Sequence, residues 1–131
     1  MSLPTEIETD RLLLRRWRPS DRAPFAELNA DARVMEHFPS VLTRAESDEM
    51  VERISAHFDR HGFGLWAVEV LERSPFIGFV GLAVPSFESH FTPCVEVGWR
   101  IAAESWGCGY ATEAARAAVT FGFGPLGLKE I

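Results

Sequence analysis

The sequence predicts a single mixed α/β (α+β) domain, with one mostly antiparallel central sheet flanked by helices. Its 131 residues, 47% hydrophobic and 24% charged, have the size and composition of one globular domain. The hydrophobic period also changes along the chain. Helical spacing before residue 62 gives way to strand-like alternation after residue 65 and returns after residue 110. Helices therefore precede and follow a run of strands.

The N-terminal part is predicted to form a strand and a short helix. Leucine and arginine partly alternate over residues 9–17, which indicates an edge strand with one buried face. Ser20 or Asp21 is expected to cap the helix, which continues through Phe25 and Leu28. We expect the arginines at positions 15, 16 and 18 to form a solvated edge or to help hold an anionic ligand.

A longer helix and a hairpin follow. Thr43 and Glu46 have the spacing of a capping box, and Gly62 supplies the end of a helix with one buried stripe. Residues 65–71 and 76–82 are typical of two strands joined by a turn, which predicts an antiparallel hairpin.

The last third is predicted to contain a loop, a strand and a second long helix. Residues 85–93 are expected to form the loop and residues 95–101 the strand. Small side chains at helical spacing allow the helix to approach a sheet closely: they are Ala111, Ala114, Ala115, Ala118 and Val119. Gly124 and Pro125 end this helix, and residues 128–131 are predicted to begin another strand.

Charge and cysteine content exclude several classes of protein. The formal net charge of −6 and the pI near 5.2 argue against a nucleic-acid binder, whose binding face is basic. Cys94 and Cys108 form neither a CxxC pair nor a disulfide framework, which favours a reduced, cytoplasmic setting without a structural metal. No apolar run reaches the length of about 18 residues that a membrane span needs, so no membrane partner is expected.

The junction over residues 101–114 carries the clearest chemical signal. A strand runs into a turn containing Gly107 and Gly109, which opens a helix, so several backbone N–H groups point outward at a helix N-terminus. Such a terminus binds anions, and glycines let a phosphate approach the backbone. The alternative is that the glycines only make a tight turn. The Walker and dinucleotide motifs do not fit, because Gly-Lys-Ser/Thr is missing and Thr112 stands where a third glycine is needed.

Residues 95–101 followed by 106–114 closely resemble the acetyl-coenzyme A motif of the GNAT superfamily of N-acetyltransferases. Residues 9–15 resemble the subgroup that includes ribosomal-protein N-terminal acetyltransferases. The order of elements agrees over nearly the whole chain. One departure is Glu104, which stands where the family has Gln or Arg; it removes a favourable charge and leaves the backbone contacts intact.

The resemblance implies acetyl-CoA as acetyl donor and places it residue by residue. The pyrophosphate would lie against the backbone of Trp106, Gly107, Cys108, Gly109, Tyr110 and Ala111, with Thr112 nearby. The pantetheine arm would lie along Val97, Gly98 and Trp99. The physical expectation agrees, since amide-rich pantetheine needs a strand-like partner and phosphates need a helix N-terminus.

The reaction implied is attack of a neutral primary amine on the thioester, in a ternary complex. A backbone N–H near residues 97–99 would stabilise the oxyanion, and a carboxylate would receive the amine's proton through water. Glu96 is our candidate base, because it lies on the opposite strand face from Val97. The alternative role for Glu96 is an exposed ion pair with Arg100 or another strand, and Glu69 is a weaker candidate base.

Other reactive residues have plainer interpretations. His57 and His61 are one helical turn apart but have no third metal ligand, so a solvated helix face is expected. Cys108 is not expected to be a nucleophile. Phe38 and the loop from Phe87 to Phe91 are candidates to line an acceptor pocket, with packing as the equal alternative.

The acceptor and the extent of the domain are left as expectations. Net acidity favours a cationic amine, whether a protein N-terminus, an aminoglycoside-like compound or a polyamine, and a homodimer stays open. Residues 1–131 are expected to be one acetyltransferase domain truncated at its C-terminus. The family's Asn contact to the cofactor and its Tyr or Ser proton donor would lie beyond it. The alternatives are a non-catalytic acyl-CoA-binding module of the same fold and an unrelated nucleotide-binding domain.

Overall fold

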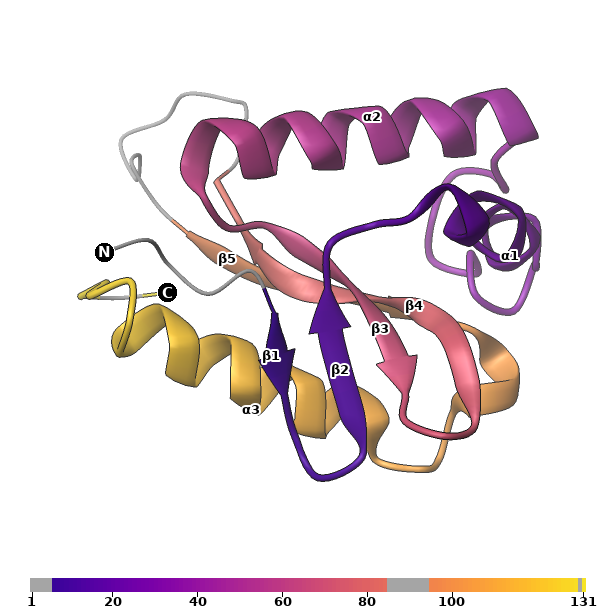
Figure 1. Ribbon diagram of the computed structural model, residues 1–131. Helices are drawn as coiled ribbons and strands as arrows, with labels where there is room; N and C mark the ends of the chain where they lie inside the picture. The colour runs from indigo at the N-terminus through magenta and orange to yellow at the C-terminus, as the bar shows by residue number, and fades with distance from the viewer. Residues whose placement is uncertain (1–5, 85–94, 130) are drawn as a thin grey trace.

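The computed structural model describes residues 6–84, 95–129 and 131, and these form a three-layer arrangement around one sheet (Figure 1). The sheet has five strands in the order β1-β2-β3-β4-β5, and every neighbouring pair is antiparallel. The strands are β1 (Ile7–Glu8), β2 (Leu12–Arg15), β3 (Leu65–Val70), β4 (Ser74–Ala83) and β5 (Glu96–Ile101). The helices are η1 (Pro19–Asp21), α1 (Arg22–Asn29), α2 (Arg44–His61), η2 (Ala103–Ser105) and α3 (Tyr110–Phe123).

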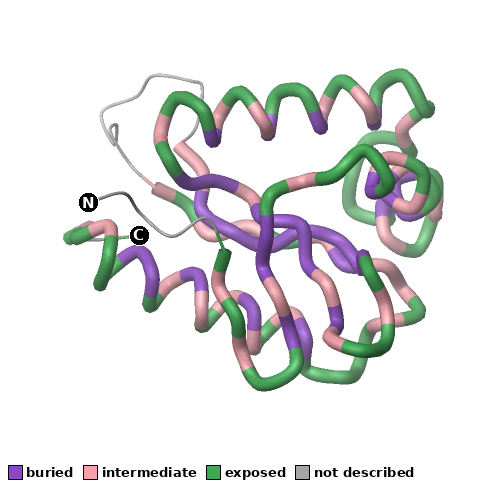
Figure 2. The backbone as a smooth tube through the Cα atoms, in the orientation of Figure 1, coloured by how far each residue is buried: buried purple, intermediate pink, exposed green. Residues whose placement is uncertain are grey.

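Helices cover both faces of the sheet. In Figure 1, α2 and α1 lie on one side and α3 on the other, and Figure 2 shows the buried positions gathered in the sheet and on the inner sides of the helices. Phe79 packs with Val51 of α2 and Phe25 of α1. On the other face, Ala114 and Ala118 of α3 are fully buried against the sheet, as the predicted small-residue stripe requires.

The predicted signals of α2 are confirmed, whereas the expected cap of α1 is wrong: Asp21 stands at its N-cap but makes no side-chain capping hydrogen bond. Thr43 accepts a hydrogen bond from the Glu46 N–H at 3.1 Å, and the Glu46 carboxylate accepts one from the Thr43 N–H at 2.9 Å, which completes the capping box at the start of α2. Gly62 follows α2 with a φ of 77°, a left-handed conformation that favours glycine. In the described part of the chain, no helix combines the length and apolarity that a membrane crossing needs.

Two strands expected from the sequence differ in the structure, and one expected loop cannot be compared. The strand predicted over residues 9–17 is shorter and is not at the edge, because Ile7 of β1 pairs with Leu14 of β2 on its outer side. Residues 128–129 form no strand; after Gly124 the chain turns back, and the Leu128 N–H donates to the Gly122 carbonyl at 2.9 Å. The loop predicted over residues 85–93 lies outside the described residues.

Candidate functional site: a helix N-terminus and a groove at the sheet edge

The turn between η2 and α3 is built by two glycines in the left-handed region. Gly107 has a φ of 81° and Gly109 a φ of 80°, and residues other than glycine rarely adopt this backbone conformation. The turn starts from a fixed position, because the Ala102 N–H donates to the Ile77 carbonyl at 2.8 Å. The Trp106 indole N–H then donates to the Ile101 carbonyl at 2.8 Å. The turn is therefore tied to the end of β5.

The backbone N–H groups of this turn are available to a ligand. The hydrogen bond that opens α3 runs from the Glu113 N–H to the Gly109 carbonyl at 3.0 Å. Among the residues that the structure describes, the N–H groups of residues 107–112 have no acceptor. Unpaired donors and the positive end of the helix dipole make this segment suited to an anion.

A groove of about 650 Å³ lies between the side of α3 and β5. Val97 and Trp99 form its strand side, and Trp99 is 57% exposed. Its helix side is formed by Ala111, Thr112, Ala115, Arg116, Val119 and Thr120. Since β5 is the outermost strand of the described sheet, the groove lies beside a strand edge with no neighbour there. Of the residues that the sequence assigned to the donor, Val97, Trp99, Ala111 and Thr112 line this groove. Gly98 and residues 106–110 do not line it.

Glu96 lies on the face covered by α2. It pairs with Ala83 of β4, and paired residues of an antiparallel sheet share a face. Ala83 in turn shares a face with Phe79, which packs against α2. Glu96 and the groove beside α3 therefore lie on opposite sides of β5.

A second cavity of about 700 Å³ lies on the α2 side, next to the position of Glu96. It is lined by Met50, Ile54, Ala56, His57, Leu65, Ala83 and Val84, and by Arg53, Arg60 and His61. Its apolar wall suits a hydrocarbon portion of a ligand, while the arginines give it local positive charge.

Arg100 follows Glu96 by four residues on the same face of β5. Its guanidinium donates to the Asn29 side-chain carbonyl at 2.7 Å and lies 4.7 Å from the centre of the Phe38 ring. Its Nε is buried and has no acceptor among the described residues, and burial lowers the pKa of Arg100. Arg100 makes no ion pair with a carboxylate in the described part of the chain, so the expected Glu96–Arg100 pair is not present there.

The arginine-rich edge predicted near residue 15 is wrong for Arg15, which is 1% exposed. Its guanidinium donates to both carboxylate oxygens of Asp21 at 2.8 and 2.9 Å, and to the Pro75 carbonyl at 2.6 Å. Hydrogen bonds to Asp21 raise the pKa of Arg15. Glu69 accepts from Arg15 at 3.1 Å and lies 3.7 Å from Arg18, so it is held in ion pairs. This removes Glu69 as an alternative base.

The remaining candidate residues differ in their exposure. His57 is not on a solvated face as expected: its Nε2 accepts from the Val84 N–H at 2.9 Å, and burial lowers its pKa. Cys108 is an exposed thiol, and Tyr110 is buried beneath the turn.

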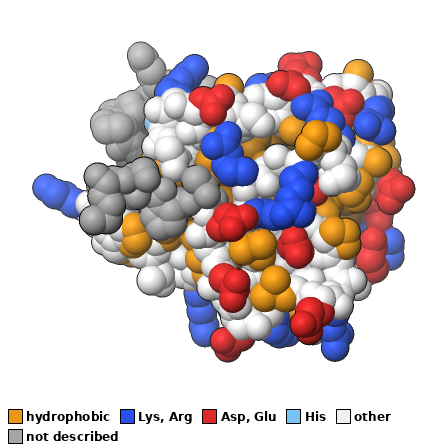
Figure 3. Space-filling model, in the orientation of Figure 1, with side chains coloured by type: hydrophobic (Ala, Val, Ile, Leu, Met, Phe, Trp, Pro, Cys, Tyr) orange, Lys and Arg blue, Asp and Glu red, His pale blue; other side chains and the backbone are white. Residues whose placement is uncertain are grey.

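No cluster of three metal-ligating side chains occurs in residues 6–84, 95–129 and 131. On the face in Figure 3, acidic and basic side chains are interspersed.

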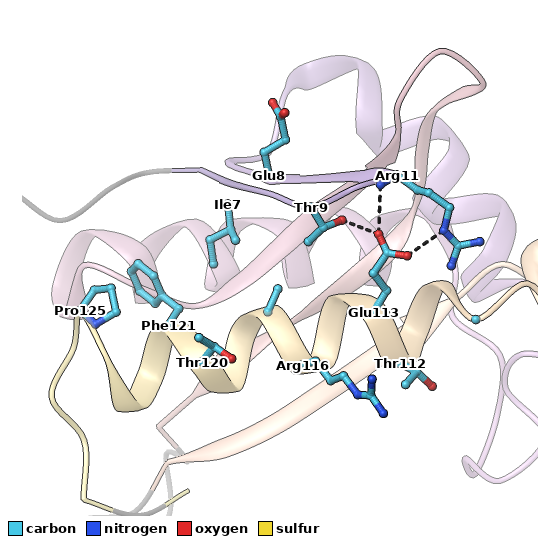
Figure 4. Close-up of a pocket in the computed structure, with 12 residues that line it drawn as sticks. Ile7, Glu8, Thr9, Arg11, Thr112, Glu113, Arg116, Thr120, Phe121 and Pro125 are labelled. Atoms are coloured by element: carbon cyan, nitrogen blue, oxygen red, sulfur yellow. Dashed lines mark hydrogen bonds and ion pairs between the residues drawn. The ribbon is translucent and has the colours of Figure 1, made fainter.

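Three residues beside the turn were not assigned a role from the sequence. Glu113 of α3 receives hydrogen bonds from Thr9 and Arg11, which lie between β1 and β2 (Figure 4). About a hundred residues separate the partners, at separations of 104 and 102 positions, so no local pattern could reveal the contact. The available signal was that both segments belong to motifs of the resembled family.

Comparison with known proteins identifies the class first. The acetyltransferase of Agrobacterium tumefaciens has the same fold, with a TM-score of 0.77 and 26% identity over 98% of this chain and 71% of that one. YkkB of Bacillus subtilis, an uncharacterized protein, is 32% identical over 94% of this chain and 71% of its own length. An FsC-acetyl coenzyme A-N(2)-transacetylase of Aspergillus fumigatus is 40% identical over 53% of this chain and 31% of its own length. The fold is that of an acyl-CoA-dependent acyltransferase.

The profile of the acetyltransferase (GNAT) domain matches residues 11–131. The chain belongs to the GNAT acetyltransferase family, whose members transfer an acetyl group from acetyl-CoA. The fold class and the family predicted from the sequence are confirmed.

Proposed function

We propose that this protein transfers the acetyl group of acetyl-CoA to a primary amine of a small molecule or a protein N-terminus, by direct attack in a ternary complex. One observation carries the proposal: unpaired N–H groups of residues 107–112 lie at the start of α3, the side of α3 and β5 form a groove, and Glu96 stands on the other side of β5. Phosphate-binding and proton-accepting groups thus flank a single strand.

Each part of the donor has a matching part of the chain. The backbone N–H groups of Gly107, Cys108, Gly109, Tyr110 and Ala111 would hold the pyrophosphate, with Thr112 at the groove wall. The expected contact from Trp106 needs correction, because its N–H donates to the Ala103 carbonyl at 3.1 Å. Val97, Gly98 and Trp99 would offer backbone groups to the pantetheine amides, because this edge has no strand neighbour in the described sheet. The donor supplies the acetyl group as an activated thioester.

Glu96 would act as the general base. The acceptor amine loses one proton, through water, to the Glu96 carboxylate as its nitrogen bonds to the acetyl carbon. An N–H of β5 near Val97 to Trp99 would donate to the acetyl oxygen as negative charge develops there. The carbon–sulfur bond then breaks, and the thiolate leaves with the bonding electrons and takes up a proton. The acetyl group is conserved and no redox step is needed.

The cavity beside Glu96 suggests what the acceptor carries besides its amine. Net acidity favours a cationic amine, but the cavity itself is bordered by Arg53 and Arg60. An acceptor with a carboxylate or phosphate remote from its amine would match both groups. A panel that pairs each ω-amino acid with the alkylamine of the same chain length tests this, because a preference for the alkylamine would contradict it.

Calorimetric titration with acetyl-CoA tests the cofactor half of the proposal. We expect saturable binding at a ratio of one per chain, with competition by CoA; absence of binding would overturn the proposal. The alternative function is a non-catalytic acyl-CoA-binding module of the same fold. We propose a cytoplasmic location for either function. Release of free thiol in the presence of an amine panel separates the two, because the module binds without release.

A further inference from the structure

A polar cluster ties the turn between β1 and β2 to the first turn of α3, and we name Arg11 and Glu113 within it the Arg11–Glu113 clamp (Figure 4). The Arg11 Nε donates to Glu113 Oε1 at 2.7 Å, and the Arg11 N–H donates to Oε2 at 3.1 Å. The Thr9 hydroxyl also donates to Oε2, at 2.5 Å. Both oxygens of Glu113 are therefore engaged by residues remote in the sequence.

The clamp also reaches the peptide that joins Cys108 to Gly109. Arg11 Nη1 donates to the Cys108 carbonyl at 2.9 Å. In a planar trans peptide the C=O and the N–H point in opposite directions. Holding the Cys108 carbonyl toward Arg11 therefore aims the Gly109 N–H away from Arg11, to the outer side of the turn.

The clamp has an electrostatic consequence as well. A carboxylate in the first turns of a helix is attracted by the helix dipole and repels an anion bound at the same terminus. Desolvation acts to raise the pKa of Glu113, but hydrogen bonds from Thr9 and Arg11 outweigh it and hold that pKa below its usual range. Glu113 is thus charged at neutral pH, and the guanidinium of Arg11 balances that charge beside the anion-binding turn.

We propose that Arg11 and Glu113 are positioning residues for the pyrophosphate of the acyl donor: they fix the Cys108–Gly109 peptide and balance the charge beside it, without touching the donor themselves. The inference rests on the proposed function. A positioning role differs from a general structural role in one measurable respect. A positioning role affects a ligand that carries the pyrophosphate and spares one that lacks it, whereas loss of fold affects both.

The experiment compares CoA with S-acetylpantetheine, which lacks the pyrophosphate. CoA affinity is measured by calorimetry, and S-acetylpantetheine affinity by NMR shift titration into the millimolar range. We expect Arg11→Met to weaken CoA by roughly tenfold or more, the scale of a lost charge-assisted hydrogen bond, because it releases the Cys108 carbonyl and leaves the Glu113 charge unbalanced. Glu113→Gln should weaken CoA less, because it loosens Arg11 but also removes a carboxylate that repels the pyrophosphate. The affinity for S-acetylpantetheine should change by less than about twofold, because this ligand has no pyrophosphate for Arg11 and Glu113 to position.

Two further variants separate geometry from charge. Arg44→Met removes a cation from an exposed pair with Asp48 on α2 and controls for net charge. Arg11→Lys keeps the charge, but a single ammonium cannot reproduce the fork that reaches both Glu113 and Cys108. We therefore expect Arg11→Lys to stay weak for CoA and Arg44→Met to match the unmodified protein. The double variant Arg11→Met with Glu113→Gln should bind CoA no more weakly than Arg11→Met alone, because the carboxylate that Arg11 balances is then removed as well.

The outcomes against the inference are distinct. Equal weakening of both ligands, full affinity in Arg11→Lys, or an effect of Arg11→Met no larger than that of Arg44→Met would each overturn the positioning role. Failure of the unmodified protein to bind CoA would instead overturn the proposed function, and the clamp inference with it. Melting curves of Glu113→Gln, the mildest change, show whether the domain is folded in the comparison.

Discussion

The two faces of the sheet hold charge in different ways. On the α3 face, the binding groups are backbone N–H donors of residues 107–112, with no acceptor among the described residues. On the α1/α2 face, the charged groups are side chains with specific partners, such as Arg15 with Asp21 and Glu69. A site made from backbone depends on local conformation, whereas one made from side chains depends on contacts that folding brings together. Outside the Arg11–Glu113 clamp, the first kind should tolerate side-chain changes that the second kind does not.

The largest expected effect comes from the buried pair on the α1/α2 face. Asp21→Asn removes the charge that faces Arg15, and both side chains are only 2% exposed. Removing the partner of a buried charge costs about 3–5 kcal/mol in the free energy of unfolding, and we expect the lower end of that range because Glu69 still pairs with Arg15 at 3.1 Å. Urea unfolding measures this loss.

The matched control is the exposed pair between Arg16 and Asp59, whose carboxylate side chain is 76% exposed. Asp59→Asn should change the free energy of unfolding by less than about 1 kcal/mol. Similar losses in Asp21→Asn and Asp59→Asn would show that burial does not distinguish the two pairs, and the contrast between the faces would fail.

The second-largest expected effect tests whether catalysis depends on the α1/α2 face and donor binding on the α3 face. Glu96→Gln should lower the rate of acetyl transfer at least about 100-fold, which is the lower range for a general base. CoA affinity should stay within about twofold, because Glu96 points away from the groove beside α3. Initial rates of thiol release and calorimetry with CoA measure the two quantities.

Glu8→Gln is the control for Glu96→Gln, since Glu8 is also an exposed glutamate in a strand. It should change neither quantity. An undiminished rate in Glu96→Gln would remove Glu96 as the base, and a large loss of CoA affinity would mean that the two faces do not divide the work.

The third effect is smaller and concerns the backbone of the turn. Gly109→Ala places a side chain at a φ of 80° and should cost about 1 kcal/mol or more in the free energy of unfolding. It should also weaken CoA binding, because the N–H groups of the turn change direction. Thr43→Ala removes a helix cap on α2 and should cost a similar amount of about 1 kcal/mol.

Thr43→Ala should leave CoA affinity unchanged, although its effect on stability matches that of Gly109→Ala. Equal CoA affinity in the two variants at equal loss of stability would show that the conformation of the turn does not matter for binding.

The difference between local patterns and long-range side-chain contacts explains what the sequence could predict. The strand, the two glycines and the alanine stripe of α3 are local patterns, so the turn at residues 106–109 and the helix after it were predictable. Gly62 and the capping box of α2 are likewise local. Only the alternation along β5 was needed to place Glu96 opposite Val97.

Long-range contacts of charged side chains were not predictable. Arg15 looked like part of a solvated edge, because its partners are set by how residues 16–21 turn back over the sheet. The outer strand β1 was missed, since Ile7 and Glu8 are too few to show alternation. The Arg11–Glu113 clamp was missed for the same reason as the Arg15 contacts: nothing within either segment indicates its partner.

The smallest effect is a pH dependence from His57 on the α2 side. Its Nε2 accepts from the Val84 N–H and its Nδ1 lies 2.9 Å from the Phe63 carbonyl, an arrangement that suits neutral imidazole with its proton on Nδ1. Burial lowers the pKa of His57, the hydrogen bond to Phe63 opposes this, and the neighbouring charges of His61 and Arg60 lower it further. The unfolded chain therefore binds a proton at this residue at a higher pH than the folded one.

It follows that the contribution of His57 is fully present above a pH of about 6.5 and is lost as the pH falls below it toward the folded pKa. Urea unfolding at pH 7.5 and at pH 5.5 measures the loss. His57→Gln, which keeps an acceptor for Val84 but does not titrate, should lose less stability between these two conditions than the unmodified protein. His37→Gln, at an exposed position, should show the unmodified dependence. An identical dependence in His57→Gln would mean that folding does not change the pKa of His57. The contact with Val84 would then add stability on the α2 side without adding a response to pH.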